Sequence, residues 1–248
     1  MSIIDSDIVL YASQNMPQSD SSTTGGEINS GVRVVFTDIA GYGKISAFSN
    51  NSNDTGNLNI TGRDAVGIIK TDTIKLSGTT AVVGTQIFDT ILVCSTDYFA
   101  SGEISIQESS SNSGVGKIFP HESGFLKPFY DATANIAGGA NKELYEKIFI
   151  KNNNLVNMFS GVSVTEVNSG LYNVVNFGLE KSQKYNESTS NRTVAPTGIT
   201  NYGAGPSGLS EPIVSNSYQG IWLKLTLNAG TERIKSSFYE ISVNGQSL

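Results

Sequence analysis

The feature that most constrains this fold is a repeated pattern of short segments in which apolar and polar residues alternate and which end at Gly, Asn or Ser. The clearest example is IWLKLTL, residues 221–227, in which apolar residues occupy every second position. Side chains of a strand point alternately to its two faces, so this spacing predicts strands with one face toward a core. The chain has 26 Gly and only 15% charged residues, which is atypical of helical bundles and disordered tails. We therefore predict an all-β fold.

Similar alternation marks other segments, at residues 32–37, 57–61, 73–77, 103–107, 172–179 and 239–243. Residues 86–94 are apolar on both faces, which is typical of a central strand covered on both sides. Residues 141–150 contain helix formers, but Ile148 and Ile150 favour a strand. Many short strands bury one face most simply by packing sheet on sheet, so we expect β-sandwiches or small barrels.

Changes in pattern along the chain predict two β domains with an arm and a linker. Residues 1–31 are expected to form an extended N-terminal arm, because residues 13–31 lack a periodic apolar set. Residues 32–108 are assigned to the first β domain, and the Ser/Asn/Gly run 109–116 to a linker. Aromatic residues become frequent after this run, so residues 117–248 are assigned to a second β-sandwich domain.

Two segments are not needed for a core and are therefore candidates for contact with a partner. Residues 180–209 are rich in Gly, Pro, Ser and Asn, and structureless loops of this length in compact domains are usually functional or disordered. We expect them at a contact surface. For the predicted arm, we hypothesise that it adds a strand to the edge of a neighbouring sheet, where main-chain hydrogen bonds supply the affinity.

Charge and hydropathy exclude several classes of partner. The net charge of −6 and the lack of a Lys/Arg cluster argue against binding to nucleic acid, because the phosphates need neutralising. Residues 1–10 do not resemble a signal peptide, and no segment approaches the roughly 20 apolar residues that cross a bilayer. We therefore expect a soluble chain without a membrane partner. The single cysteine, Cys94, cannot form an internal disulfide and is expected in the core.

The usual devices of hydrolytic and metal catalysis are missing from the sequence. His121, within Pro120-His121-Glu122, is the only histidine, and Cys94 lies in a predicted core strand, so a Cys-His or Ser-His-Asp arrangement is disfavoured. One His and one Cys cannot supply the ligand set of a zinc site. We predict that the chain is not an enzyme and that it has no catalytic, cofactor-binding or metal-binding residues.

Three weaker patterns have ordinary explanations as turns. The segment GAGPSG, residues 203–208, matches a dinucleotide-binding spacing, but it lacks the flanking strand and helix. Residues 50–54 could suggest calcium, but the Gly and Glu of a calcium loop are missing. Glycoside hydrolysis needs two carboxylates, and six aspartates lie near predicted turns, where Asp is common for local hydrogen bonding: Asp38, Asp54, Asp64, Asp72, Asp89 and Asp97.

Residues 59–93, NITGRDAVGIIKTDTIKLSGTTAVVGTQIFDTILV, resemble a module of tailed-bacteriophage virion proteins, notably head-decoration or cement proteins. YEKIFIKNNN, residues 145–154, and GIWLKLTLNAG, residues 220–230, are similar to parts of phage structural β-sandwiches. The resemblance implies a virion protein that is made in the host bacterial cytoplasm, binds the major capsid protein on the capsid exterior and stabilises the shell. The resemblance also implies a homo-oligomer, for example a trimer. Residues 180–209 have no counterpart in it.

A second placement stays open, because the resembling segments contain no catalytic signature and do not identify contact residues. The chain could be a tail, neck or fibre-associated binding module, in which Tyr202, Tyr218 or Trp222 stack on sugars. Packing of these rings between sheets is the competing explanation. Glycoside hydrolysis ranks third, because no particular pair of carboxylates stands out. The number of copies per virion would separate shell from tail.

Overall fold

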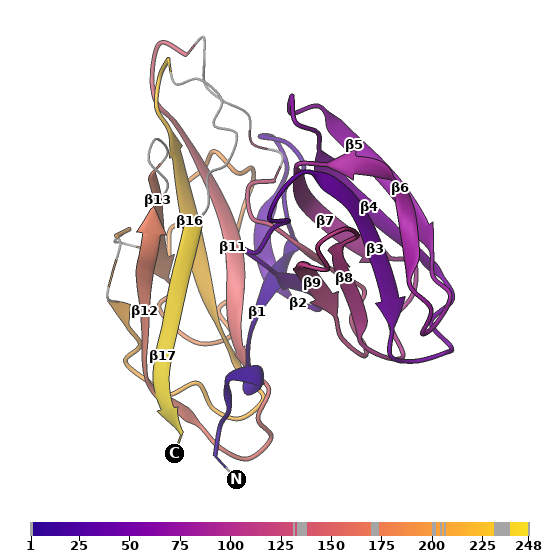
Figure 1. The fold of residues 1–248 in the computed structure, drawn as a ribbon. Helices are drawn as coiled ribbons and strands as arrows, with labels where there is room; N and C mark the ends of the chain where they lie inside the picture. Colours follow the sequence, from indigo (N-terminus) through magenta and orange to yellow (C-terminus); the bar gives the residue numbers. More distant parts are fainter. Residues whose placement is uncertain are drawn as a thin grey trace. The chain divides into compact units, whose positions relative to one another are not determined.

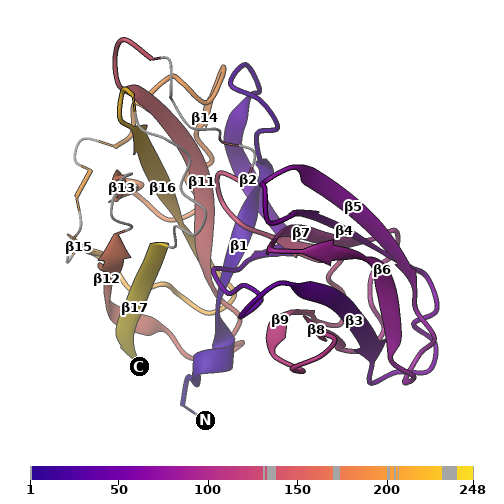
Figure 2. The ribbon, with the colours of Figure 1, turned by 45° about the horizontal axis from the view of Figure 1, so that its top comes forward.

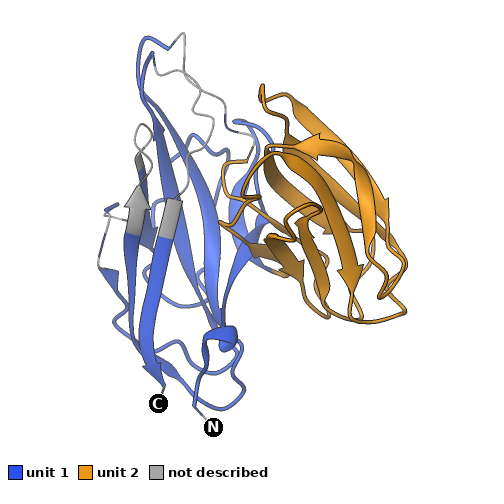
Figure 3. Ribbon diagram, viewed as in Figure 1, with its two compact units in different colours: residues 1–29, 131–248 blue, residues 30–130 orange. Residues whose placement is uncertain are grey.

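The computed structural model describes residues 2–130, 132, 138–169, 174–199, 202–203, 205, 207–230 and 239–247. It is nearly all β, with 53% strand, and this confirms the predicted fold class. The one short helix in the part described is a 3₁₀ turn, η1 (Asp5–Asp7). The chain divides into two compact units, shown in Figure 3: unit 1 is Met1–Asn29 with Asp131–Leu248, and unit 2 is Ser30–Tyr130.

Unit 2 is built from two layers of strands. One layer has the order β6-β3-β8-β9, formed by β6 (Val82–Phe88), β3 (Gly43–Ser49), β8 (Ile104–Glu108) and β9 (Gly114–Ile118). The other has the order β10-β7-β4-β5, formed by β10 (Gly124–Leu126), β7 (Thr90–Thr96), β4 (Asn57–Arg63) and β5 (Ile69–Lys75). The end of β2 (Thr24–Val34) pairs with β10 in parallel.

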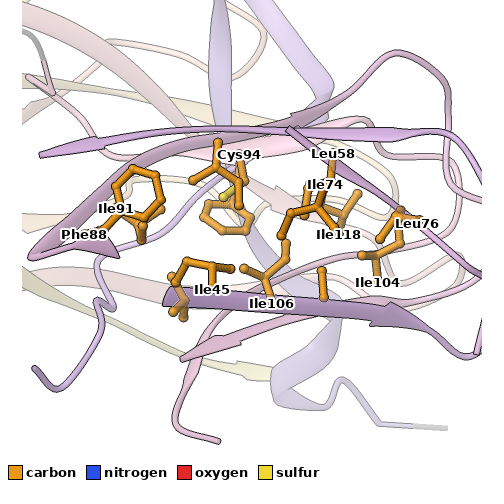
Figure 4. Close-up of a cluster of buried hydrophobic side chains, with 14 of the residues drawn as sticks. Ile45, Leu58, Ile74, Leu76, Phe88, Ile91, Cys94, Ile104, Ile106 and Ile118 are labelled. Atoms are coloured by element: carbon orange, nitrogen blue, oxygen red, sulfur yellow. The ribbon is translucent and has the colours of Figure 1, made fainter. Parts of the chain in front are cut away.

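The core of unit 2 lies between these layers, as Figure 4 shows. Alternate residues of each strand point inward, so both layers contribute side chains that are almost fully buried: Ile45, Leu58, Ile60, Ile74, Phe88, Ile91, Cys94, Ile104, Ile106 and Ile118. The pattern is that of strands with one face buried, and β-branched Ile suits a pleated surface. Packing of sheet on sheet therefore stabilises this unit.

Asp72 closes one edge of the unit 2 sandwich. It lies on β5, the last strand of its layer, and its carboxylate reaches β6, the last strand of the other layer. Oδ2 accepts hydrogen bonds from the backbone N–H of Thr85 (2.7 Å) and Gln86 (2.9 Å). Burial raises the pKa of Asp72, but hydrogen bonds from Gln86, Thr85 and Thr73 outweigh this and hold it below its usual range. The donors on this stretch of β6 are thus satisfied without another strand.

Replacing Asp72 should weaken unit 2. In Asp72→Ala the amides of Thr85 and Gln86 lose their acceptor, and a loss of unfolding free energy of about 1 to 3 kcal/mol is expected. Urea unfolding of the full chain measures it, with Lys75→Ala, an exposed position on the same strand, as the control. Equal stability of the two variants would contradict this role.

The predicted linker at residues 109–116 is wrong. Residues 109–113 form the turn of the β8–β9 hairpin inside unit 2, and residues 114–116 are the start of β9. The Glu108 carboxylate accepts hydrogen bonds from the backbone N–H of Ser110 (3.0 Å) and Ser111 (2.6 Å) and from the Ser110 hydroxyl. Small polar residues suit a flexible linker and a tight turn equally, so composition alone could not separate the two.

The Glu108 turn should make stability depend on acid pH. Hydrogen bonds from the Ser111 side chain and from the Ser110 and Ser111 amides lower the pKa of Glu108 from 4.5 to about 2. The stabilisation is therefore complete above pH 4.5 and is lost as the pH falls toward 2. Glu108→Gln should lower the thermal midpoint at pH 7, with the difference from wild type narrowing below pH 4.5. Glu103→Gln is the control, and a pH-independent difference would argue against the assignment.

Unit 1 also contains two sheets (Figures 1 and 2). The larger has the order β13-β16-β11-β1-β2, formed by β13 (Val174–Leu179), β16 (Tyr218–Leu227), β11 (Lys142–Asn152), β1 (Ile8–Asn15) and the start of β2, to which β14 (Ser188–Thr189) adds. The smaller has the order β15-β12-β17, formed by β15 (Ser207–Gly208), β12 (Phe159–Ser169) and β17 (Tyr239–Ser247). Strand β11 confirms the strand assignment of residues 141–150.

The predicted N-terminal arm is wrong, because β1 and the start of β2 lie inside the larger sheet of unit 1. Ile8 to Ala12 pair antiparallel with β11. The first residues of β2 show no apolar period because they pack backbone against a ring: a Cβ on Gly25 would come within 2.8 Å of the Trp222 indole. Glycine therefore marks a close approach here rather than flexibility. The unit boundaries, at 29/30 and 130/131, differ accordingly from the predicted 31/32 and 116/117.

Candidate functional site

The residues weighed for nucleophilic catalysis have structural roles. Cys94 is fully buried in the unit 2 core, and burial raises the pKa of its thiol. His121 lies in the turn between β9 and β10 with a left-handed backbone (φ 67°), and its N–H donates to the Ala100 carbonyl. The Glu122 carboxylate binds Nε of Arg33 at 2.6 Å and accepts from the backbone of Phe119. The thiol is thus closed to an external substrate.

The aspartates near turns act as acceptors for local donors. Asp54, in the segment weighed for calcium, is buried and accepts from the Ser49 hydroxyl (2.6 Å) and from the N–H of Ser101 (2.8 Å) and Gly102 (2.9 Å). N–H and O–H donors thus occupy the oxygens that a cation would need. Among the described residues, no group of three or more His, Cys, Asp or Glu could hold a metal ion.

The other aspartates are distributed in the same way over unit 2. Asp38 pairs with Lys127 and accepts from the N–H of Ile91. The Asp97 carboxylate accepts a hydrogen bond from the N–H of Asn57, and the Asp64 carboxylate accepts one from the N–H of Ile68 in its own hairpin. The N–H of Asp89 donates to the Arg63 carbonyl. Asp72 closes the sandwich edge. Turn formation, rather than a shared catalytic cleft, accounts for these positions.

The glycine-rich segment 203–208 contributes to sheet pairing where it is described. Gly203 and Phe177 exchange two backbone hydrogen bonds of 3.1 Å, and Ser207–Gly208 form β15 against β12. Ala204 and Pro206 lie outside the described residues. Backbone amides engaged with strands are not directed at a phosphate, so the dinucleotide-binding spacing is a coincidence of turn composition.

The aromatic residues weighed for sugar stacking pack within unit 1. Trp222 is fully buried, and its Nε1–H donates to Oε1 of Glu180 at 3.1 Å. The Tyr202 ring lies 5.7 Å from that of Tyr145, and Tyr218 meets Phe149 edge-on at 5.3 Å. These are the separations of aromatic pairs in a core. Trp222 in particular presents no face on which a sugar could stack.

Unit 1 contains a fully buried ion pair that sequence reasoning missed. Lys147 lies on β11 directly opposite Trp222 on β16, and its Nζ is 2.6 Å from Oε1 of Glu180, with both side chains at 0% exposure. Nζ also donates to the carbonyls of Tyr185 (2.9 Å) and Gly26 (3.1 Å). The only signal in the sequence is a Lys inside an otherwise buried strand, and this does not identify its partner.

Burial dominates the electrostatics of this pair. It raises the pKa of Glu180 to about 7, against the opposing effects of Lys147 and Trp222. It also lowers the pKa of Lys147, against the attraction of Glu180. The second oxygen of Glu180, Oε2, has no hydrogen-bond partner among the described residues, and it lies where a Cβ on Gly220 would overlap it. The pair is sealed from solvent, so its role is structural.

A second buried cation holds the same segment to the sheet. Arg192 is almost fully buried, and its guanidinium binds Asp20 at 2.8 Å and Glu146 at 3.3 Å. Its carbonyl accepts the N–H of Tyr145, which extends the edge of β11. The described part of residues 180–209 is therefore packed on its own unit through Glu180 and Arg192, and its expected place at a contact surface stays a prediction.

Breaking the buried pair should strongly destabilise unit 1. Lys147→Met leaves the Glu180 carboxylate buried without its cation, and a loss of about 3 to 5 kcal/mol is expected. Adding Glu180→Gln to that variant should restore part of the loss, because the unpaired charge is removed. Lys224→Met is the matched control, since Lys224 pairs with Glu143 near the surface and such pairs contribute about 0 to 1 kcal/mol. Urea unfolding measures all four proteins, and equal losses for the two lysines would contradict the assignment.

Two loop tips expose apolar side chains on a backbone that is held by side-chain hydrogen bonds, and they are candidate binding features. In the β4–β5 hairpin of unit 2, Val66 and Ile68 are 71% and 58% exposed, and the Asp64 carboxylate accepts their two N–H groups. In the β11–β12 loop of unit 1, Leu155 and Val156 are each 79% exposed. Oδ1 of Asn154 accepts from the N–H of Val156 (3.0 Å) and of Asn157 (2.8 Å).

Comparisons with known proteins leave the site to be interpreted from its own residues. No protein-family model, curated protein or solved structure matches the chain. Over the residues that the structure describes, no helix is both long enough and apolar enough to span a membrane. The exposed loop tips and the sequence resemblance therefore carry the functional argument.

Proposed function

We propose that this chain is a non-enzymatic virion structural protein of a tailed bacteriophage, which binds the outer surface of the head and stabilises the shell. The observation that carries the proposal is the pair of rigid loop tips that expose Val66 and Ile68 in unit 2 and Leu155 and Val156 in unit 1. Large exposed apolar side chains on ordered turns are a feature of protein-binding surfaces. The resemblance of residues 59–93 to head-decoration proteins supports the virion location in this proposal.

The use of the charged residues supports a structural role. Asp54, Asp72 and Glu108 accept local hydrogen bonds that shape turns and an edge. Lys147 and Glu180 are sealed inside unit 1. An enzyme needs titratable groups that meet a substrate, whereas in this protein the strongly buried groups hold the fold together.

Repetition on a symmetric shell makes small binding surfaces sufficient. A decoration protein occupies many equivalent sites, and contacts that bridge neighbouring shell subunits add avidity to a modest affinity for each. The partner in this proposal is the major capsid protein, with further contacts between copies of this chain as a homo-oligomer. Tail, neck or fibre attachment is the alternative, and there Trp222 would not contribute to sugar binding because it is buried.

Quantitative mass spectrometry of purified virions tests the proposal. We expect on the order of hundreds of copies per particle, because shell sites repeat with the symmetry of the head. Particles lacking the protein should rupture at a lower temperature than wild-type particles. A few dozen copies would favour the tail tube or neck instead, and absence from purified virions would overturn the proposal.

A further inference from the structure

Three segments that meet at one end of unit 1 carry five exposed apolar side chains. The segments are far apart in the sequence, and between 40% and 79% of each side chain is exposed: Ile4, Leu155, Val156, Met158 and Val214. Figures 1 and 2 show η1, which follows Ile4, beside the loop that joins β11 to β12 at the end of unit 1 that carries the N-terminus. We call this set the apolar end.

Hydrogen bonds between the three segments hold the apolar end in place. The Asn152 side chain donates to the carbonyls of Ile213 (3.1 Å) and Asn157 (3.0 Å), which ties the β11–β12 loop to the segment before β16. The Asp7 carboxylate accepts from the Asn154 side chain (3.0 Å) and the Ile4 N–H (3.1 Å), which ties the loop to the N-terminal segment. A surface fixed in this way loses little conformational entropy on binding.

The charged side chains within the three segments of the apolar end are all acidic. Residues 2–7, 153–158 and 211–216 contain three charged side chains, Asp5, Asp7 and Glu211, and no Lys or Arg. Hydrogen bonds from Asn154 and Ile4 keep the pKa of Asp7 below its usual range, so this carboxylate stays ionised at neutral pH. We call these three carboxylates the acidic rim. They would repel anionic lipid and nucleic acid, and they would also repel the acidic rim of a second copy.

We propose that the apolar end is the docking surface for a protein that presents an apolar recess bordered by Lys or Arg side chains. This rests on the proposed function in one respect: the protein in question is the shell protein of the head. The five side chains act as the central anchors of the contact, because anchors near the centre carry most of the energy of an interface. The acidic rim selects the partner by charge complementarity and speeds its encounter.

Co-sedimentation of the full chain with heads that lack it tests the inference. Leu155→Ser with Val156→Ser should weaken binding at least ~10-fold, because each exposed side chain removes apolar area from water on docking. Tyr42→Ser with Phe99→Ser, two exposed unit 2 positions outside both loop tips, is the matched control and should bind as wild type does. All four side chains are exposed, so the thermal midpoint of both variants should stay close to that of wild type.

Charge reversal at the rim tests the chemistry of the partner. Asp5→Lys with Glu211→Lys should weaken binding to heads and remove its decrease with added salt. Retained binding by the Leu155/Val156 variant, or loss of binding in the Tyr42/Phe99 control alone, overturns this inference and leaves the proposed function standing. Failure of wild type to bind heads overturns both, and sedimentation of wild type with phosphatidylserine vesicles would identify a membrane rather than a protein as the partner.

Discussion

A backbone N–H that has no partner strand needs another hydrogen-bond acceptor. In this protein, carboxylate and amide side chains supply that acceptor. Asp54 gathers donors from a loop nearly fifty residues away in the sequence. Asp72 takes two donors from the edge of the opposite layer. Glu108 and Asn154 do the same within single turns. A chain with many short strands has many such donors, and this explains why Asp54, Glu108 and Asn154 lie between strands or at their ends.

In unit 1, the buried ammonium group of Lys147 is satisfied by acceptors in the same way. Lys147 donates to main-chain carbonyls and to Glu180, so one ammonium group joins the sheet, the start of β2 and the segment after β13. Such a pair adds little net stability compared with an apolar core, because both charges lose their water. Its effect is specificity, since the segment carrying Glu180 finds a satisfied position only where the lysine lies. Gly25 and Gly220 provide the space for that arrangement.

Alternation of apolar residues, as in residues 221–227, was sufficient to predict the all-β fold because the period of a strand is a local property. The arm and the linker were predicted wrongly, and the packing of residues 180–209 was not predicted, for two reasons. Gly25 packs on Trp222, Glu108 folds its own turn, and Glu180 pairs with Lys147. In the first and third cases the partner is distant in the sequence, and in the second the composition is ambiguous. No local pattern encodes these contacts.

Some of the candidate binding residues could have been identified from the sequence. Val66, Ile68 and Leu155 stand beside Gly, Asp or Asn in segments that read as turns, and apolar residues in turns are a signal that strand periodicity overlooks. That the segments of Ile4 and Val214 meet the loop of Leu155 could not be predicted, because this depends on the Asn152 and Asp7 hydrogen bonds between segments.

The Asp72 contact bears on how the molecule behaves when crowded. On a shell, copies of the chain would lie at very high local concentration, where an uncapped strand edge would let one copy extend the sheet of the next without limit. A single carboxylate that occupies the amides of Thr85 and Gln86 removes a place where chains could join. In the proposed shell, this would favour a finite layer over an open-ended fibre, because these amides could not pair with a strand of another copy.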